Sequence, residues 1–257
     1  MAGARMMLRR RQLLARGAVG GSALLLGACD RVIERPTVRT ILFKGEDIHR
    51  GLQRALFDRD ALAPEFRPDQ MSPRFRTNGT RDPGTDAYAA LRAGRFADWR
   101  LTVDGLVARP LALSLSDLGA FPQRAQITRH DCVEGWSAIG KWQGPRLADV
   151  LRAAGLSDRA RYVVFTCADY YGGAPYYESI DLVDAFHPQT ILAWAMNDRF
   201  LDVGHGAPLR LRVERQLGYK QAKYLMRVTA VESLAGVGKG RGGYWEDNVD
   251  YDWWAGI

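Results

Sequence analysis

Cysteine is scarce in this chain of 257 residues, and the positions of its three cysteines exclude one kind of redox site. They are Cys29, Cys132 and Cys167, and none belongs to the Cys-x-x-Cys-His pattern that attaches a c-type haem. Any redox chemistry on this chain would therefore exchange electrons with a separate carrier.

Other absences exclude whole groups of proteins. The sequence contains no P-loop, no dinucleotide-binding fingerprint and no internal repeat. These absences argue against P-loop nucleotide hydrolases, Rossmann-type dehydrogenases and repeat proteins.

A strongly basic surface is also missing once the N-terminus is set aside. The formal charge of +7 includes five arginines among the first 28 residues, which contain no acid, so the remainder carries only +2. This balance gives no electrostatic reason to expect nucleic-acid binding. The 47% of apolar residues is ample for a buried core.

The first 28 residues have the layout of an export signal. Arg10-Arg11-Gln12-Leu13-Leu14 fits a twin-arginine signal, whose pathway carries folded proteins, and the apolar run 18–26 is too short to span a bilayer comfortably. Leu26-Gly27-Ala28-Cys29 is similar to a bacterial lipobox, although an ordinary cleavage site with an incidental cysteine is the alternative. We therefore expect residues 1–28 to be a twin-arginine signal peptide of the lipoprotein type. The lipid on Cys29 would hold the protein on the periplasmic side of the inner membrane.

Residues 29–74 are expected to form a charged lead-in that tethers the folded domain. Four prolines between residues 36 and 73 should prevent a long helix, and residues 47–60 have the spacing of a short one.

The segment Ile127–Trp142 contains the main candidate for chemistry. If residues 127–134 are extended, the two-residue period of a strand places His130, Cys132 and Glu134 on one face. These are groups that bind metals or move protons, and a thiolate is a soft metal ligand.

The residue types alone leave other readings open. Cys132 could be a small buried residue or form a disulfide with Cys167, in which case the protein would be a non-catalytic lipoprotein. A zinc hydrolase could use Cys132 with His130 and with His187 or His205, although these spacings match no zinc signature.

The string Cys132-Val-Glu-Gly-Trp-Ser resembles the cofactor-anchoring segment of the sulfite oxidase-like molybdopterin oxidoreductases. It is most similar to the branch that contains the periplasmic protein-methionine-sulfoxide reductase catalytic subunit. In this family the cysteine sulfur binds molybdenum, so the resemblance implies that Cys132 is the metal ligand of Mo-molybdopterin. The similarity extends over about residues 75–234.

A second segment carries the same resemblance. His205-Gly-Ala-Pro-Leu-Arg210, followed by Gly-Tyr-Lys-Gln-Ala-Lys223, is similar to the family's pterin-binding segment, in which Asn is more usual at the position of His205. The match implies that Arg210 and Lys223 hold the pterin phosphate, with Gln221 and Ala222 offering backbone N–H groups. A buried phosphate needs bidentate and point-charge donors together.

Two further residues complete the predicted site. Asn78 matches the family's first pterin contact, after a short strand. Cys167 matches a position at a strand end near the metal, where the methionine-sulfoxide reductase branch has Thr, and Thr166 lies beside it.

The resemblance implies an α+β fold for residues 75–257, a sulfite oxidase-type molybdopterin-binding domain with a strand-rich mixed sheet and short helices. It also implies an exported oxidoreductase that transfers oxygen atoms and exchanges electrons with a membrane cytochrome or another carrier. Glu134 would handle protons or contact the substrate. Because this carboxylate would repel an anion, we expect a sulfoxide or another neutral oxide as substrate, with a sulfite-oxidising enzyme as the alternative.

Overall fold

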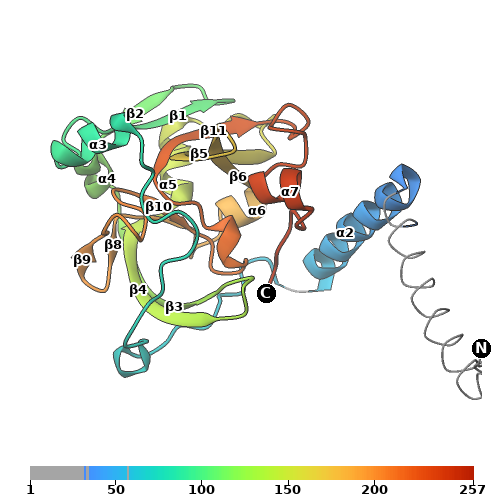
Figure 1. Ribbon diagram of the computed structural model, residues 1–257, viewed down its shortest axis with the longest axis horizontal. Coiled ribbons are helices and arrows are strands. Elements are labelled where there is room, and N and C mark those ends of the chain that lie inside the picture. The colour runs from blue at the N-terminus through green and yellow to red at the C-terminus, as the bar shows by residue number, and fades with distance from the viewer. Residues whose placement is uncertain (1–31, 33–34, 57) are drawn as a thin grey trace, which may run out of the picture. The chain divides into compact units, whose positions relative to one another are not determined.

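A computed structural model describes residues 32, 35–56 and 58–257, which belong to two units divided after Leu56 (Figure 1). The predicted export signal and Cys29 lie outside the described residues.

Helix α2, Pro36–Leu56, makes up most of the described part of the first unit. The prediction that proline would prevent a long helix here is wrong. Pro36 occupies the first position of the helix, where a missing N–H costs no helical hydrogen bond, and no further proline follows before Leu56. None of the helices in the described ranges combines the length and hydropathy of a bilayer span.

The second unit contains a large mixed sheet, as the sequence predicted. Its strand order is β2-β1-β11-β5-β6, in which β1 runs parallel to β11 and the other neighbours are antiparallel. The strands are β1 (Leu101–Gly105), β2 (Leu111–Leu113), β5 (Tyr162–Tyr171), β6 (Ala174–Asp181) and β11 (Leu225–Val231).

Two smaller antiparallel sheets carry the predicted cofactor segments. One has the order β3-β4-β8-β9, in which β3 and β4 form a long curved hairpin (Figure 1), and the other pairs β10 with β7. Gly144 lets β4 lie against β7, because a Cβ there would be 2.0 Å from the Leu192 carbonyl oxygen. The strands are β3 (Gln123–Asp131), β4 (Ser137–Pro145), β7 (Ile191–Ala193), β8 (Ala195–Met196), β9 (Arg199–Phe200) and β10 (Arg210–Arg212).

Short helices connect the strands, as expected for this fold class. The spacing of Leu147, Val150, Leu151 and Ala154 predicted a helix that ends at Gly155, and this is α5 (Leu147–Ala154), with Gly155 in the left-handed conformation. The other helices are α3 (Asp86–Ala93), α4 (Leu115–Ala120), α6 (Leu182–Ala185), α7 (Tyr244–Val249) and the 3₁₀ turns η1 (Pro68–Gln70) and η2 (Gly218–Lys220).

The main core joins α5 to the mixed sheet. Val150 and Leu151 of α5 belong to one buried cluster with Val103 of β1, Phe165 of β5 and Val228 of β11. Burying such side chains contributes about 1.5–3 kcal/mol each, so this layer makes the sheet a firm support for the loops at its edge.

Residues 58–74 pack on the β3–β4 hairpin. The N–H of Phe66 donates to the carbonyl of Ile127 over 2.9 Å, and that of Ser72 donates to the carbonyl of Ile139 over 3.0 Å. The second unit thus includes a segment that the sequence assigned to the lead-in.

Candidate active site

Cys132 lies at the end of a strand, where the chain turns. Strand β3 ends at Asp131, and the N–H of Cys132 donates to the carbonyl of Trp136 over 2.9 Å. Gly135, at a φ of +82°, closes this turn. The strand alternation therefore stops before Glu134, and the turn directs Cys132 and Glu134 to a common cavity.

Seven of the nine predicted site residues line this cavity. Three segments, each more than 50 residues from the next, meet here: the loop after η1, the β3–β4 turn and the segment around η2. The amide Nδ2 of Asn78 is 3.9 Å from the Cys132 sulfur. The seven residues are Asn78, Cys132, Glu134, Arg210, Gln221, Ala222 and Lys223.

The two remaining predicted residues lie behind the lining. Cys167 belongs to the main hydrophobic core on β5, and burial raises the pKa of its thiol well above the usual range. Asp169, two residues further along the same strand, lines the cavity instead. Direct contact of Cys167 with a cofactor stays a prediction.

His205 supports the basic end of the cavity from outside it. Its Nδ1 lies 2.8 Å from the carboxylate of Asp202, and its carbonyl accepts from Arg210 over 3.1 Å. The neighbouring Gly206, at a φ of +105°, is needed for close packing, because a Cβ there would lie 2.9 Å from Cβ of Lys223.

Arg210 and Lys223 are buried cations at one end of the cavity. Arg210 is 2% exposed, and burial together with the charge of Arg212 lowers its pKa to about 9. Burial and the charge of Arg210 lower the pKa of Lys223 to about 7. Lys223 donates to the carbonyls of Asn78 over 2.8 Å and Gly204 over 3.0 Å.

Neither cation has a partner of opposite charge within the part of the chain that the structure describes. Both donate to backbone carbonyls, and the buried Nε of Arg210 has no acceptor among the described residues. Two buried positive charges without a carboxylate partner are costly. An anionic group in this cavity would offset that cost, so the residues fit the phosphate of a pterin cofactor.

Gln221 lines the cavity with its hydrogen-bond donors already in use. Its N–H donates to the carbonyl of Gly218 over 3.1 Å, and its side-chain amide donates to the carbonyls of Val213 and Gln216. Gln221 therefore holds the shape of the loop, and Ala222 is the better candidate for a backbone donor to the cofactor.

His130 lies in a buried network behind the cavity. Its Nδ1 is 3.1 Å from Nη1 of Arg212, which also forms a buried ion pair with Glu214 at 2.6 Å. Burial and the charge of Arg212 hold the pKa of His130 well below its usual range, so the ring is neutral. Gly218 lines the cavity directly over this ring, because a Cβ there would lie 2.4 Å from His130 Nε2.

The alternative readings of the sequence find no support in this arrangement. No group of three or more His, Cys, Asp or Glu side chains that could hold a metal occurs among the described residues, and His187 contacts the carbonyl of Ala61. This argues against the zinc site. Cys132 and Cys167 are both free thiols, so the predicted alternative of a disulfide between them is wrong.

Sequence reasoning did not place several residues that line the cavity. They are Asp169, Tyr219 of η2, and Trp245 and Tyr251 of the aromatic C-terminal tail. For the tyrosine-rich segment 169–177 the sequence leaves open whether its tyrosines line a substrate mouth or pack inside the protein, and the structure places Tyr171 and Tyr176 in the cavity lining.

Comparisons with known proteins identify the family. The family model described as the oxidoreductase molybdopterin-binding domain matches residues 89–235. A protein from Azospira oryzae named YedZ1, provisionally assigned as a protein-methionine-sulfoxide reductase subunit, is 38% identical over 248 residues, covering 96% of this chain and 87% of its own.

More distant relatives match over part of their length. The protein-methionine-sulfoxide reductase catalytic subunit MsrP of Xanthomonas campestris is 34% identical over 58% of this chain, and that of Campylobacter jejuni is 31% identical over 51%. This chain spans about half the length of these two relatives. The sulfane dehydrogenase SoxCD of Paracoccus pantotrophus matches with a TM-score of 0.48 and 24% identity over 58% of this chain and 44% of its own. By the family model and the extended match to the Azospira protein, the chain belongs to the sulfite oxidase-like molybdopterin-dependent oxidoreductases.

Proposed function

We propose that this molybdopterin-dependent oxidoreductase reduces a sulfoxide, with methionine sulfoxide as the best candidate substrate. The observation that carries the proposal is one cavity that joins a thiol, two buried cations without carboxylate partners and a carboxylate at its rim. The names of the relatives, which are protein-methionine-sulfoxide reductase subunits, support the choice of substrate.

Each part of the cavity has its own task in this proposal. Cys132 would bind the metal, and Arg210 and Lys223 would hold the pterin phosphate, with Ala222 and Asn78 as neighbouring polar contacts. When bound, Mo-molybdopterin supplies a metal that changes its oxidation state by two electrons. The protein binds the cofactor, orients the substrate and excludes water from the space around them.

Glu134 is placed to move protons. Reduction of a sulfoxide consumes two protons and two electrons and yields a thioether and water. Glu134 lines the cavity, lies among exposed residues and accepts a hydrogen bond from Trp136 Nε1 over 3.2 Å. It can therefore exchange protons with solvent and pass them inward, and its negative charge disfavours an anionic substrate such as sulfite.

Purified full-length protein tests the proposal directly. We expect equimolar molybdenum and pterin, and turnover of methionine sulfoxide with a reduced artificial donor. Sulfite oxidation with an artificial acceptor should be much slower. The opposite preference would favour the sulfite-oxidising alternative, and absence of molybdenum would contradict the cofactor assignment at Cys132.

Replacing Glu134 with Gln should lower turnover about 100-fold, within the range typical of general acid–base groups. The substitution keeps the shape and the hydrogen bond to Trp136 but removes the titrating proton, so the pH profile of kcat should lose one limb. Molybdenum and pterin content should stay normal. An unchanged pH profile would place Glu134 outside the proton path.

We also propose that the protein is exported by the twin-arginine pathway and anchored at Cys29 beside the inner membrane. The exposed surface of helix α2 supports the proposal that the protein lies at a membrane. Ile41, Ile48, Leu52 and Leu56, spaced seven, four and four residues apart, form one apolar face and are all more than half exposed. Residues 35–56 carry a net charge of +3, as is typical of helices that lie on anionic membranes.

The distance along the chain is consistent with this location. Pro36 follows Cys29 by seven residues, so α2 would start within about 25 Å of a lipid anchor. A membrane cytochrome, or another electron carrier, is then the proposed electron partner.

Mass spectrometry of the exported protein should show an acylated Cys29 at the N-terminus, and fractionation should recover it with membranes. Cys29→Ala should release most of the protein into the periplasmic fraction, because two or three acyl chains hold a protein far more firmly than a helix face. An unmodified N-terminus at another residue would contradict the anchor.

A further inference from the structure

The cavity has two unlike sides. One side is polar and cationic and contains Arg210 and Lys223, next to the thiol of Cys132. The other side is an aromatic wall of five rings. We define the aromatic wall as Tyr171, Tyr176, Tyr219, Trp245 and Tyr251.

The rings of the wall contact one another. The ring centroids of Tyr171 and Trp245 are 5.5 Å apart at 66°, and those of Trp245 and Tyr251 are 6.1 Å apart. Tyr219 and Tyr251 are 5.0 Å apart at 63°. At the other end, the hydroxyl of Tyr171 accepts from the N–H of Thr80 over 3.0 Å, beside the loop that contacts the thiol. One end of the aromatic wall is therefore bonded to the same loop, residues 78–80, that contacts Cys132.

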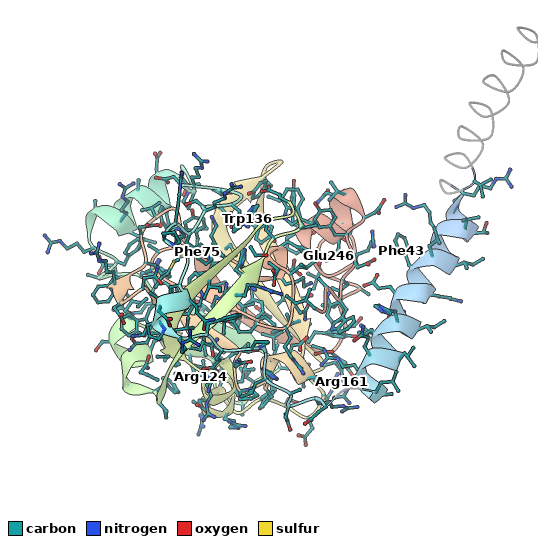
Figure 2. The ribbon with its side chains drawn as sticks, turned by 90° about the horizontal axis from the view of Figure 1, so that it is seen from below. Phe43, Phe75, Arg124, Trp136, Arg161 and Glu246 are labelled. Atoms are coloured by element: carbon teal, nitrogen blue, oxygen red, sulfur yellow. The ribbon has the colours of Figure 1, made fainter. Side chains whose placement is uncertain are left out.

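Two of the five rings, Trp245 and Tyr251, come from the last 14 residues of the chain. A buried ion cluster fixes this tail, because Lys220 contacts both Glu178 of β6 and Glu246 of α7, at 2.7 Å to Glu246. Figure 2 shows Glu246 on α7, beside the body of the second unit. All three side chains are fully buried, which leaves α7 little freedom to move.

Backbone contacts extend this docking to the end of the chain. The N–H of Leu217 donates to the carbonyl of Ala255 over 2.9 Å, and the N–H of Ile257 donates to the carbonyl of Arg215 over 3.0 Å. The tail is thus attached to the segment that leads into η2, and its rings hold fixed positions in the cavity.

The chemistry of the aromatic wall differs from that of the cofactor phosphate. Ring faces are electron-rich, so they attract polarisable sulfur and alkyl groups and offer nothing to an anion. A sulfoxide with an alkyl chain has both a soft sulfur and an apolar portion. The sulfur and the apolar portion suit the aromatic wall, while the oxygen of the sulfoxide would face the side of the cavity that contains the thiol.

We propose that Trp245 and Tyr251 form the binding subsite for the alkyl-sulfur part of the substrate. The C-terminal tail would then favour sulfoxides with a methionine-like side chain over smaller oxides. This inference rests on the proposed sulfoxide reductase function.

The test uses the full-length, cofactor-loaded protein and two sulfoxides. Methionine sulfoxide and dimethyl sulfoxide react at the same kind of bond, but only methionine sulfoxide has a long alkyl chain to place on the wall. Trp245→Leu and Tyr251→Leu should each raise the KM for methionine sulfoxide about tenfold and that for dimethyl sulfoxide by less, with kcat within about twofold of wild type. Trp245→Phe should restore most of the affinity.

Phe200→Leu is the matched control, because Phe200 is 77% exposed on β9 and belongs to no part of the aromatic wall. It should leave both KM values unchanged. Unchanged KM values in both tail variants would overturn the subsite. Loss of molybdenum and pterin from them would show that the rings hold the cofactor instead. If the wild-type protein contains cofactor and reduces neither sulfoxide, the proposed function fails and the subsite fails with it.

Discussion

Replacing Cys132 with serine should abolish turnover and leave a folded protein. The hydroxyl is almost the same size as the thiol and fits the same turn, but it is a hard donor that does not replace a thiolate at a molybdenum centre. Loss of partners in the outer shell of a metal site typically costs about 10–100-fold, and loss of the ligand itself should cost more. Reduction of methionine sulfoxide with an artificial donor measures the effect, and circular dichroism with the melting temperature reports on the fold.

The state of the thiol adds a second readout. Burial, together with the negative charge of Glu134, raises the pKa of Cys132 in the cofactor-free chain. The cofactor must therefore displace a proton when it binds, so its affinity should rise with pH. Serine in place of Cys132 removes this pH dependence.

Cys167 provides the comparison. It is also buried, but it packs in the main core instead of lining the cavity. Cys167→Ala should lower the melting temperature somewhat and keep most of the activity. Full activity in Cys132→Ser would contradict the metal-thiolate assignment, whatever the second variant does.

The sequence predicted the fold class, and its short motifs named seven residues that meet in one cavity. Cys132 and Lys223 are 91 positions apart, and no periodicity in the chain brings them together. The motif residues meet because each motif has a defined local conformation: β3 ends just before Cys132, and Gly206 packs against the side chain of Lys223.

Features that depend on tertiary contact were missed. Three tryptophans in the last 13 residues predict a tail that docks on its own domain or on a partner. The tail does dock on the second unit, but its sequence gives no sign that Trp245 lines the cavity. Asp169 lines the cavity although the family pattern favoured Cys167, and the register between β5 and β6 shifts between Thr166 and Tyr170, an irregularity that the sequence does not show. Helix α2 was longer than predicted because a proline begins a helix as readily as it ends one.

Arg212 shows the same limit. By strand alternation Arg212 lies on the same side of the strand as Arg210. The sequence therefore suggests that Arg212 lies beside the phosphate contact without holding the cofactor itself. In the structure it is fully buried, stacks over Trp142 at 4.2 Å and forms an ion pair with Glu214. Reversing its charge would place two carboxylates together in the core, so Arg212→Glu is no control for the cofactor site.

The double variant Arg210→Glu with Lys223→Glu should yield protein without cofactor. In the cofactor-free chain burial and the charge of Arg210 lower the pKa of Lys223 to about 7, a shift that reflects the cost of confining two positive charges in one site. A phosphate would raise this pKa again and satisfy both cations, which makes cofactor binding favourable. Two carboxylates in their place would face the phosphate across a buried space, at a cost of several kcal/mol.

Surface arginines give a control with the same change in net charge. Arg159 pairs with Glu232 on the surface and Arg227 lies 3.5 Å from Asp104, and more than half of each arginine side chain is exposed. Such pairs contribute at most about 1 kcal/mol, so Arg159→Glu with Arg227→Glu should keep normal cofactor content.

The proposed export provides an independent readout of the same site. Twin-arginine transport favours folded cargo, and occupation of the cavity joins the loop around Asn78 to the segment around Lys223, which already meet through a 2.8 Å hydrogen bond. The Arg210 and Lys223 double variant should therefore accumulate in the cytoplasm as uncleaved precursor, while the surface double variant is exported. Elemental analysis, pterin fluorescence and precursor size on immunoblots measure the three effects. If the cavity variant reaches the periplasm with normal molybdenum and pterin, the two cations do not hold the cofactor, and the basic end of the cavity must serve another anion.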